Sequence, residues 1–217
     1  MSVVRITLPD NSIKEFDHEP TVLEVAASIG ERLANDTVGA QINDSKEIID
    51  LREPLADGTQ LKLITIKMDE ANEVIRHSAA HVLAQAILEF HPKAKLTIGP
   101  AIENGFYYDI DLEGEVISEK DFSQIEKKFL ELARGKHEFK LRSISKADAL
   151  AYYKEEGNQY KVELIENLTD GDITFCDHAD FTDLCRGGHI PHTGIIKAIK
   201  VMNVAGAYWR GDEKNNQ

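Results

Sequence analysis

The stretch RHSAAHVLAQAIL, residues 76–88, decides how the second half of the chain is interpreted. After its first residue it carries no formal charge, yet it holds His77 and His81 four positions apart. At about 100° per residue, its apolar residues gather on one side of a helix and the two histidines lie together roughly opposite. Lys and Glu normally occupy such an outer side. The stretch therefore predicts a helix, ending near Phe90, whose histidine side faces a cleft.

A second polar motif follows about a hundred residues later. DFTDLCRGGHIPH, residues 180–192, holds Asp183, Cys185 and His189 around a Gly-Gly turn. An H-x3-H pair and a C-x3-H pair together could form a tetrahedral zinc site. The same groups also suit hydrolysis without a metal, because a histidine of near-neutral pKa can position and deprotonate water. Spacing alone leaves both readings open, and leaves Cys185 as ligand, nucleophile or packed residue.

Residues 1–66 predict a small domain of their own. Strand-like alternation, a turn and a capping box at Thr21 and Glu24 give a strand–strand–helix order with two later strands. The expected strands are VVRITL (3–8), SIKEF (12–16), VGAQIN (38–43) and TQLKLITIK (59–67). This order favours a β-grasp, ubiquitin-like module. It contains no cluster of nucleophile, base or ligands, so we expect a binding or docking role.

Residues 67–217 predict a second, α+β domain with an antiparallel sheet and packed helices. Beyond the histidine helix, the patterns indicate two short strands around a turn in 96–111, a helix over 118–134, a strand over 139–144 and a helix over 146–157. After Tyr160 the pattern predicts mostly short strands, so that Lys161 reads as a surface residue on a strand. The fold class expected for the whole chain is α+β.

Composition narrows the function. The net charge of −13 argues against non-specific nucleic-acid binding, which depends on neutralising phosphates. No apolar run approaches the roughly 20 residues that span a bilayer, and the N-terminus does not read as a signal peptide. Two cysteines without a secretory signal read as reduced thiols. These features predict a cytoplasmic protein that does not enter membranes.

Five motifs, in this order, resemble the N-terminal half of bacterial threonyl-tRNA synthetases. They are RHSAAHVLAQAI, IGPAIENGFYYDID, YKVELI, DLCRGGHIPHTG and VAGAYWRGD. The resemblance covers essentially the whole chain and implies a TGS domain followed by an editing domain. It implies hydrolysis of the ester of mischarged Ser-tRNA(Thr), with the serine-bearing 3′ end of tRNA(Thr) as partner. It places ATP, Mg and a zinc ion in an absent aminoacylation domain, and homodimerisation in the absent C-terminal half.

The resemblance also implies roles for individual residues. His77 would position or activate the attacking water, and Lys161 would stabilise the developing charge or orient that water. Asp183 would bind the seryl ammonium or hydroxyl, and Tyr108 would line the site near the terminal adenosine. The pocket would be completed by His81, Cys185 and His189. One departure is Gly188, where the family commonly has proline; glycine gives the backbone more freedom there.

The same resemblance bears on the metal. Alanyl-type editing proteins use the four residues equivalent to His77, His81, Cys185 and His189 to hold zinc, whereas the threonyl family is expected to work here without a metal. We therefore expect no cofactor in this region, with zinc as the alternative. Two other functions remain open: a zinc-dependent alanyl-type aminoacyl-tRNA deacylase, and a non-catalytic tRNA-docking module.

Overall fold

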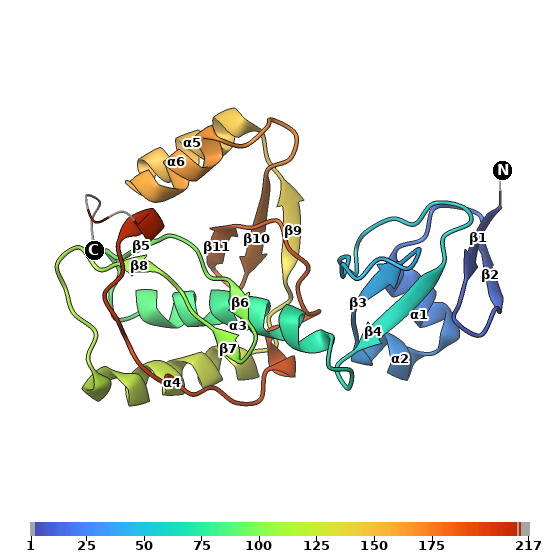
Figure 1. Cartoon of the computed structure of the whole chain (residues 1–217), viewed down its shortest axis with the longest axis horizontal. Helices are drawn as coiled ribbons and strands as arrows, with labels where there is room; N and C mark the ends of the chain where they lie inside the picture. The colour runs from blue at the N-terminus through green and yellow to red at the C-terminus, as the bar shows by residue number, and fades with distance from the viewer. Residues whose placement is uncertain (1–2, 212, 214–217) are drawn as a thin grey trace. The chain divides into compact units, whose positions relative to one another are not determined.

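The computed structural model describes residues 3–211 and 213 (Figure 1). The chain divides into two compact units. One contains residues up to Ser78 together with Gly187–Pro191, and the other contains Ala79–Arg186 and the residues from His192 onward. The predicted domain boundary between residues 66 and 67 stays a prediction.

The first unit begins as a β-grasp fold. Strands β1 (Val4–Thr7) and β2 (Ile13–Phe16) form an antiparallel hairpin, and β3 (Thr37–Ile42) pairs antiparallel with β4 (Leu61–Thr65). A parallel bridge between Thr7 and Gln60 joins the two pairs. The connecting segment forms α1 (Val22–Ile29) and α2 (Glu31–Asp36). The β-grasp prediction is confirmed, whereas the short α2 was not predicted.

The core of this fold is apolar, as the sequence pattern requires. The predicted capping box is present at the start of α1: Thr21 Oγ1 accepts from the Glu24 amide at 3.2 Å, and the Thr21 amide donates to Glu24 Oε2 at 2.7 Å. Such a box satisfies backbone donors that the first helical turn leaves without partners. The helix then packs Val22 and Val25 against Val4, Ile6 and Leu61, all of which are buried.

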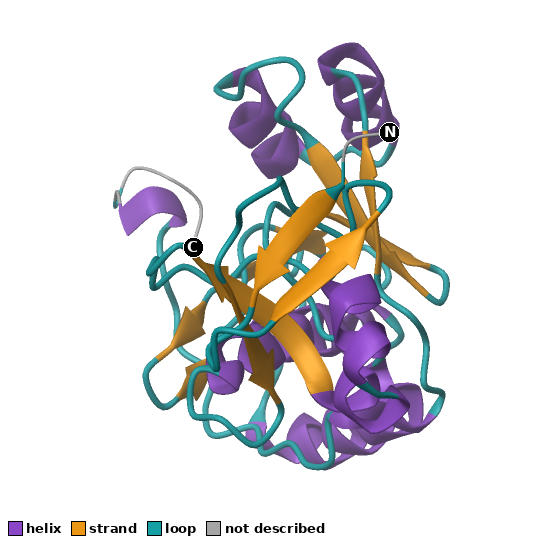
Figure 2. Ribbon diagram, turned by 90° about the vertical axis from the view of Figure 1, so that its right-hand side faces the viewer, coloured by secondary structure: helices purple, strands orange, loops and turns teal. Residues whose placement is uncertain are grey.

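The second unit combines helices with short antiparallel strands, which confirms the α+β class. Its helices are α3 (Ala71–Leu88, beginning in the first unit), α4 (Glu119–Arg134), α5 (Lys146–Glu155) and α6 (Gln159–Glu166). A three-stranded sheet has the order β11-β10-β9, formed by Phe181–Leu184, Thr174–His178 and Lys140–Ser143. Two-residue strands pair as β5 (Lys95–Leu96) with β8 (Ile110–Asp111), and β6 (Ala101–Ile102) with β7 (Gly105–Phe106). Short 3₁₀ turns occur at η1 (Thr193–Ile195) and η2 (Trp209–Gly211). Long loops connect these short elements (Figure 2).

Two sequence predictions in this unit need correction. YKVELI is not part of a strand: it forms most of helix α6, and Lys161 is buried rather than on the surface. The histidine helix is also less two-sided than predicted. Between Ser78 and Ile87 every residue except Leu83 is buried, while Phe90, expected in the core, is 39% exposed. The helix lacks charges because it is enclosed on almost all sides.

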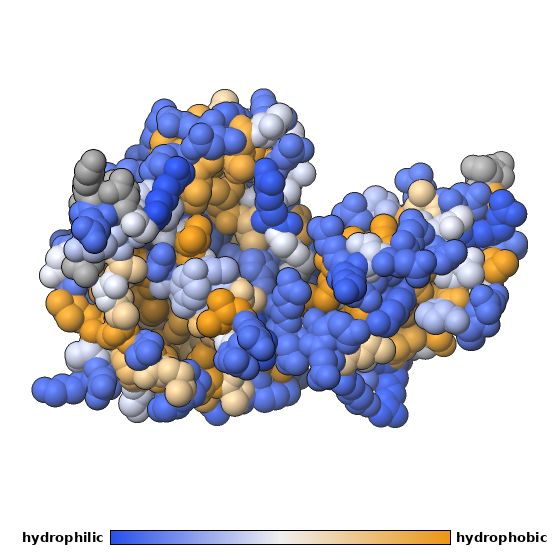
Figure 3. Space-filling view, viewed as in Figure 1, coloured by the Kyte–Doolittle hydropathy of each residue, from blue (hydrophilic) through white to orange (hydrophobic). Residues whose placement is uncertain are grey.

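The molecular surface is largely polar on the face that the space-filling view shows. Hydrophilic residues cover much of the face drawn in Figure 3. None of the described helices combines the length and the apolar character that crossing a bilayer requires.

Candidate functional site

Asp183 on β11 is the centre of a buried polar cluster. One carboxylate oxygen, Oδ1, lies 2.5 Å from Lys161 Nζ. The other, Oδ2, accepts a hydrogen bond from the Tyr108 hydroxyl at 2.5 Å and lies 3.2 Å from His81 Nδ1. The side chains of Lys161 and Asp183 are each only 3% exposed. The structure therefore brings together four residues that the sequence assigned to one site.

The position of Lys161 follows from how α6 begins. Asn158 is the N-cap, and its side-chain oxygen accepts from the Lys161 amide at 3.1 Å. Its side-chain amide donates to the Leu96 carbonyl at 2.9 Å, which ties the start of α6 to β5. Capping fixes the first turn of a helix, where Lys161 lies. The anchored first turn of α6 therefore places the Lys161 ammonium next to Asp183.

Tyr108 is held by close packing. A Cβ added at Gly99 would lie 2.4 Å from Tyr108 Cδ2 and 3.2 Å from the Cβ of Ala80. Both distances are shorter than ordinary van der Waals contacts, so no side chain fits at position 99 while the ring keeps its place. Because Gly99 has no side chain, there is room for the Tyr108 ring beside α3.

The electrostatics of the cluster favour its charged forms. Burial by itself would raise the pKa of Asp183, but Lys161 and His81 outweigh it and hold that pKa well below its usual range. Burial likewise opposes protonation of His81, yet interactions with Cys185 and Asp183 raise its pKa to about 9. Burial and the neighbouring carboxylate raise the pKa of Tyr108, so its hydroxyl remains a donor. The cluster is a preorganised set of charges and donors.

The imidazole rings of His77 and His189 lie side by side. Their ring centroids lie 4.8 Å apart with an interplanar angle of 44°. His189 is fully buried, and its backbone amide donates to Asp50 Oδ2 at 3.1 Å. A Cβ added at Gly187 would lie 2.9 Å from His77 Nε2, so the loop passes directly beside the imidazole. His77 itself is only partly buried, which leaves it within reach of water.

At the neighbouring Gly188, by contrast, a side chain would meet no close contact. A Cβ at this position would meet its nearest atom, the Cα of Asp50, at 3.6 Å, which is an ordinary contact. The backbone freedom expected at this glycine is limited by the hydrogen bond on the next residue, His189.

Three histidines and Cys185 have the composition of a metal site. One ligand atom from each of His77, His81, Cys185 and His189 lies within 4.8 Å of the others. Ligand atoms around a tetrahedral zinc ion are about 3.3–3.8 Å apart, given zinc–ligand bonds near 2.0–2.3 Å. The contact of His81 with Asp183 is the kind of carboxylate support that orients metal-binding histidines. The donor set, three imidazoles and one thiol, therefore fits zinc by its chemistry.

Sequence reasoning missed one residue of the polar cluster. Tyr153 on α5 is buried, and its hydroxyl lies 3.4 Å from Asp183 Oδ1. The only sequence signal is its helical spacing from Ala149, which places it on the buried side of α5. That spacing predicts a core aromatic and says nothing of its hydroxyl partner.

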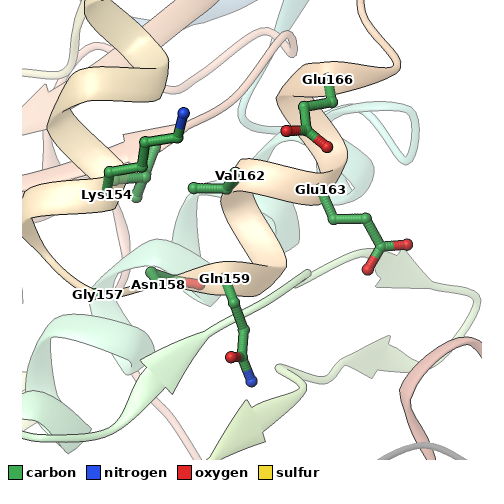
Figure 4. Close-up of a pocket in the computed structure, with 8 residues that line it drawn as sticks. Lys154, Gly157, Asn158, Gln159, Val162, Glu163 and Glu166 are labelled. Carbon is green, nitrogen blue, oxygen red and sulfur yellow. The ribbon is translucent and has the colours of Figure 1, made fainter.

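A surface hollow between α5 and α6 is separate from the charged groups of the cluster. Figure 4 shows Lys154 of α5 on one side and Val162, Glu163 and Glu166 of α6 on the other. None of the residues that the sequence assigned to the site lines this hollow.

Comparison with known proteins finds two domain families in this chain. The profile of the TGS domain matches residues 4–65, and that of the threonyl and alanyl tRNA synthetase second additional domain matches residues 173–217. The chain has the domain make-up of the N-terminal region of threonyl-tRNA synthetases. The second match includes Asp183, Cys185 and His189. The synthetase family resemblance found in the motifs is confirmed.

Sequence similarity to these synthetases extends along almost the full chain. It is 56% identical over 215 residues to a threonine–tRNA ligase of Flavobacterium johnsoniae and 47% identical over 215 residues to one of Parabacteroides distasonis. It is 50% identical over 221 residues to a threonine–tRNA ligase of Bdellovibrio bacteriovorus. These matches cover 99–100% of this chain but 33–34% of each relative. The chain thus spans about a third of the length of the curated synthetases that it matches.

Proposed function

We propose that this region hydrolyses the ester bond of Ser-tRNA(Thr), removing serine that has been attached to threonine tRNA in error. The observation that carries the proposal is the Lys161–Asp183 ion pair, enclosed with Tyr108 and His81. Enclosed charge pairs with perturbed pKa values are typical of functional sites. The relatives are threonine–tRNA ligases, and their name supports tRNA as the partner.

Two residues have catalytic roles in this proposal. His77 positions or deprotonates the water that attacks the seryl ester, a role suited to an imidazole near neutral pH. Lys161 stabilises the negative charge that develops on the ester oxygen, or orients the water. An ammonium group has three donors, so contact with Asp183 leaves Lys161 further N–H groups to offer.

The remaining residues bind the substrate. Asp183 receives the seryl ammonium or hydroxyl, and Tyr108 lines the site near the terminal adenosine. His81, Cys185 and His189 complete the pocket and hold polar groups of the substrate. Serine lacks one methyl group of threonine, and a missing methylene gives only about 10- to 200-fold discrimination by binding alone. A second, tightly packed chamber that excludes the larger side chain supplies the rest.

The alternative is a zinc ion held by His77, His81, Cys185 and His189, whose side chains are the types that bind zinc. When bound, zinc would lower the pKa of a coordinated water. The four residues would then be ligands and Asp183 would orient His81. This version corresponds to a zinc-dependent deacylase of the alanyl type. We propose the metal-free reaction, with ATP, Mg and a zinc ion serving the aminoacylation domain of whole synthetases.

Partners and location follow from the proposed reaction. The partner is the 3′ end of tRNA(Thr) carrying serine. Residues 1–66 act as a TGS docking domain and residues 67–217 as the editing domain. We further propose a cytoplasmic location and, for the whole synthetase, a homodimer formed through its C-terminal half.

The test is a deacylation assay on purified chain with Ser-tRNA(Thr), Thr-tRNA(Thr) and Ala-tRNA(Ala). Hydrolysis of the seryl ester alone, unaffected by a chelator, supports the proposal. Loss of activity on chelation, with preference for the alanyl substrate, indicates the zinc-dependent alternative. Hydrolysis of none of the three contradicts the proposal and leaves a docking module.

A further inference from the structure

Tyr153 is a buried residue to which the proposed reaction gives no role. It lies on α5 and is 4% exposed. Its ring packs edge-to-face against Phe175, with centroids 5.5 Å apart, and against Tyr152 at 5.0 Å. Such aromatic contacts restrict the ring and therefore fix where its hydroxyl lies.

The Tyr153 hydroxyl bridges the main chain and the side chain at the end of β11. It accepts a hydrogen bond from the Leu184 amide at 2.7 Å and donates one to Asp183 Oδ1 at 3.4 Å. The Leu184 amide also lies 2.8 Å from Asp183 Oδ1. One partly buried N–H is thus shared between the tyrosine and the carboxylate. Burial, together with the nearby carboxylate, raises the pKa of Tyr153 well above its ordinary value, so the hydroxyl keeps its proton.

The orientation of the Asp183 carboxylate matters because its two oxygens have different partners. Oδ1 faces Lys161, whereas Oδ2 faces Tyr108 and His81. A rotation of the carboxylate toward its own main chain would lengthen the contact with Lys161. A group that satisfies the Leu184 amide opposes that rotation, because the amide then depends less on the carboxylate.

The geometry points to Tyr153 as a positioning residue: its hydroxyl, by bridging the Leu184 amide and Asp183, fixes the carboxylate in the orientation that holds Lys161. Tyr153 itself does not touch the substrate. Its catalytic consequence rests on the proposed function, whereas its effect on Asp183 does not.

The test compares Tyr153→Phe with the matched control Tyr152→Phe. Both changes remove one hydroxyl and keep the ring; Tyr152 also packs against Phe175, with centroids 5.3 Å apart. For Tyr153→Phe we expect kcat for Ser-tRNA(Thr) to fall about tenfold, the equivalent of one hydrogen bond, with KM unchanged. For Tyr152→Phe we expect kcat within about twofold of the original chain, since the hydrogen bonds to Asp183 and Leu184 come from Tyr108 and Tyr153 instead.

A second readout separates this inference from the proposed function. The ¹³C carboxyl signal of Asp183 and the amide signal of Leu184, recorded at one pH, should shift in Tyr153→Phe and stay in place in Tyr152→Phe. Signals that do not move overturn the inference, whatever the activity. A moved signal with kcat and KM unaltered also overturns it. If the original chain has no deacylase activity, the proposed function fails and the two signals alone decide the positioning role.

Folding of the variant is checked by circular dichroism. If Tyr153→Phe does not fold, p-aminophenylalanine at position 153 replaces it in the same comparison. Its amino group donates to Asp183 but is a poor acceptor for the Leu184 amide. We expect it to retain part of the activity, and activity equal to the original chain with an unmoved Leu184 signal would contradict the bridging role.

Discussion

Replacing Lys161 with methionine tests the buried ion pair. Methionine keeps the apolar length of the side chain but removes the closer of the two cations beside the Asp183 carboxylate, which is 3% exposed, and leaves only His81. Breaking a buried pair from one side costs about 3–5 kcal/mol because an uncompensated charge stays buried. Asp183 retains the hydrogen bond from Tyr108 and the contact with His81, so we expect a value near the lower limit, about 3 kcal/mol. Lys154→Met, at an exposed position on the neighbouring helix α5, should change the free energy of unfolding by less than about 0.5 kcal/mol.

The loss of stability caused by Lys161→Met should be smaller at lower pH. In the original chain the pKa of Asp183 is lowered, so its charged form stabilises the fold above the unfolded pKa near 3.9, and this contribution is lost as pH falls through the folded pKa. Without Lys161, burial is opposed by fewer groups, among them His81 and Tyr108, so the pKa of Asp183 rises and the variant regains stability relative to the original chain once Asp183 is protonated. Urea unfolding at pH 7 and at about pH 4.5 should therefore give a smaller difference at the lower pH. A cost below about 1 kcal/mol at pH 7, or a difference independent of pH, would refute the ion-pair reasoning.

Three further predictions concern packing and metal. Gly99→Ala places a Cβ 2.4 Å from Tyr108 and should cost about 1–3 kcal/mol in urea unfolding, whereas Gly30→Ala, with nothing within 4 Å, should cost less than about 1 kcal/mol; equal costs would contradict the account. Gly187→Ala forces His77 to move, since the new Cβ lies 2.9 Å from Nε2, and should reduce seryl deacylation about tenfold, the effect of losing roughly 1.4 kcal/mol of transition-state stabilisation; unchanged activity would argue against a role for His77. Elemental analysis should find no stoichiometric zinc, and a chelator should leave the melting temperature unaltered; one zinc per chain would establish the alternative.

Several features could be predicted because neighbouring residues determine them. The capping box at Thr21 needs only a glutamate three positions later, and the one at Ser118 needs only Asp121. Both helices start where these pairs predict. The β-grasp order was likewise readable from alternating strands and one helix, because each of these patterns is local.

Other features depend on contacts between distant residues. YKVELI was predicted as a strand because its apolar residues alternate, but the Asn158 cap and its bond to Leu96 stabilise a helix instead. Burial of Lys161 is favourable only beside Asp183, a partner 22 residues away in the sequence. The bridging hydroxyl of Tyr153 has no sequence signal at all. In the candidate site, the residue types were readable, whereas the partners that make them a charged cluster were not.

The central claim is that the charged cluster around Asp183 receives a seryl ester. The most direct measurement is a crystal structure of the chain with a non-hydrolysable seryl-adenosine analogue, paired with a titration of the threonyl analogue. The account predicts the seryl ammonium or hydroxyl at Asp183, the carbonyl carbon within reach of His77 and Lys161, and much weaker binding of the threonyl analogue. A seryl group bound away from Asp183, or equal affinity for the two analogues, would contradict it.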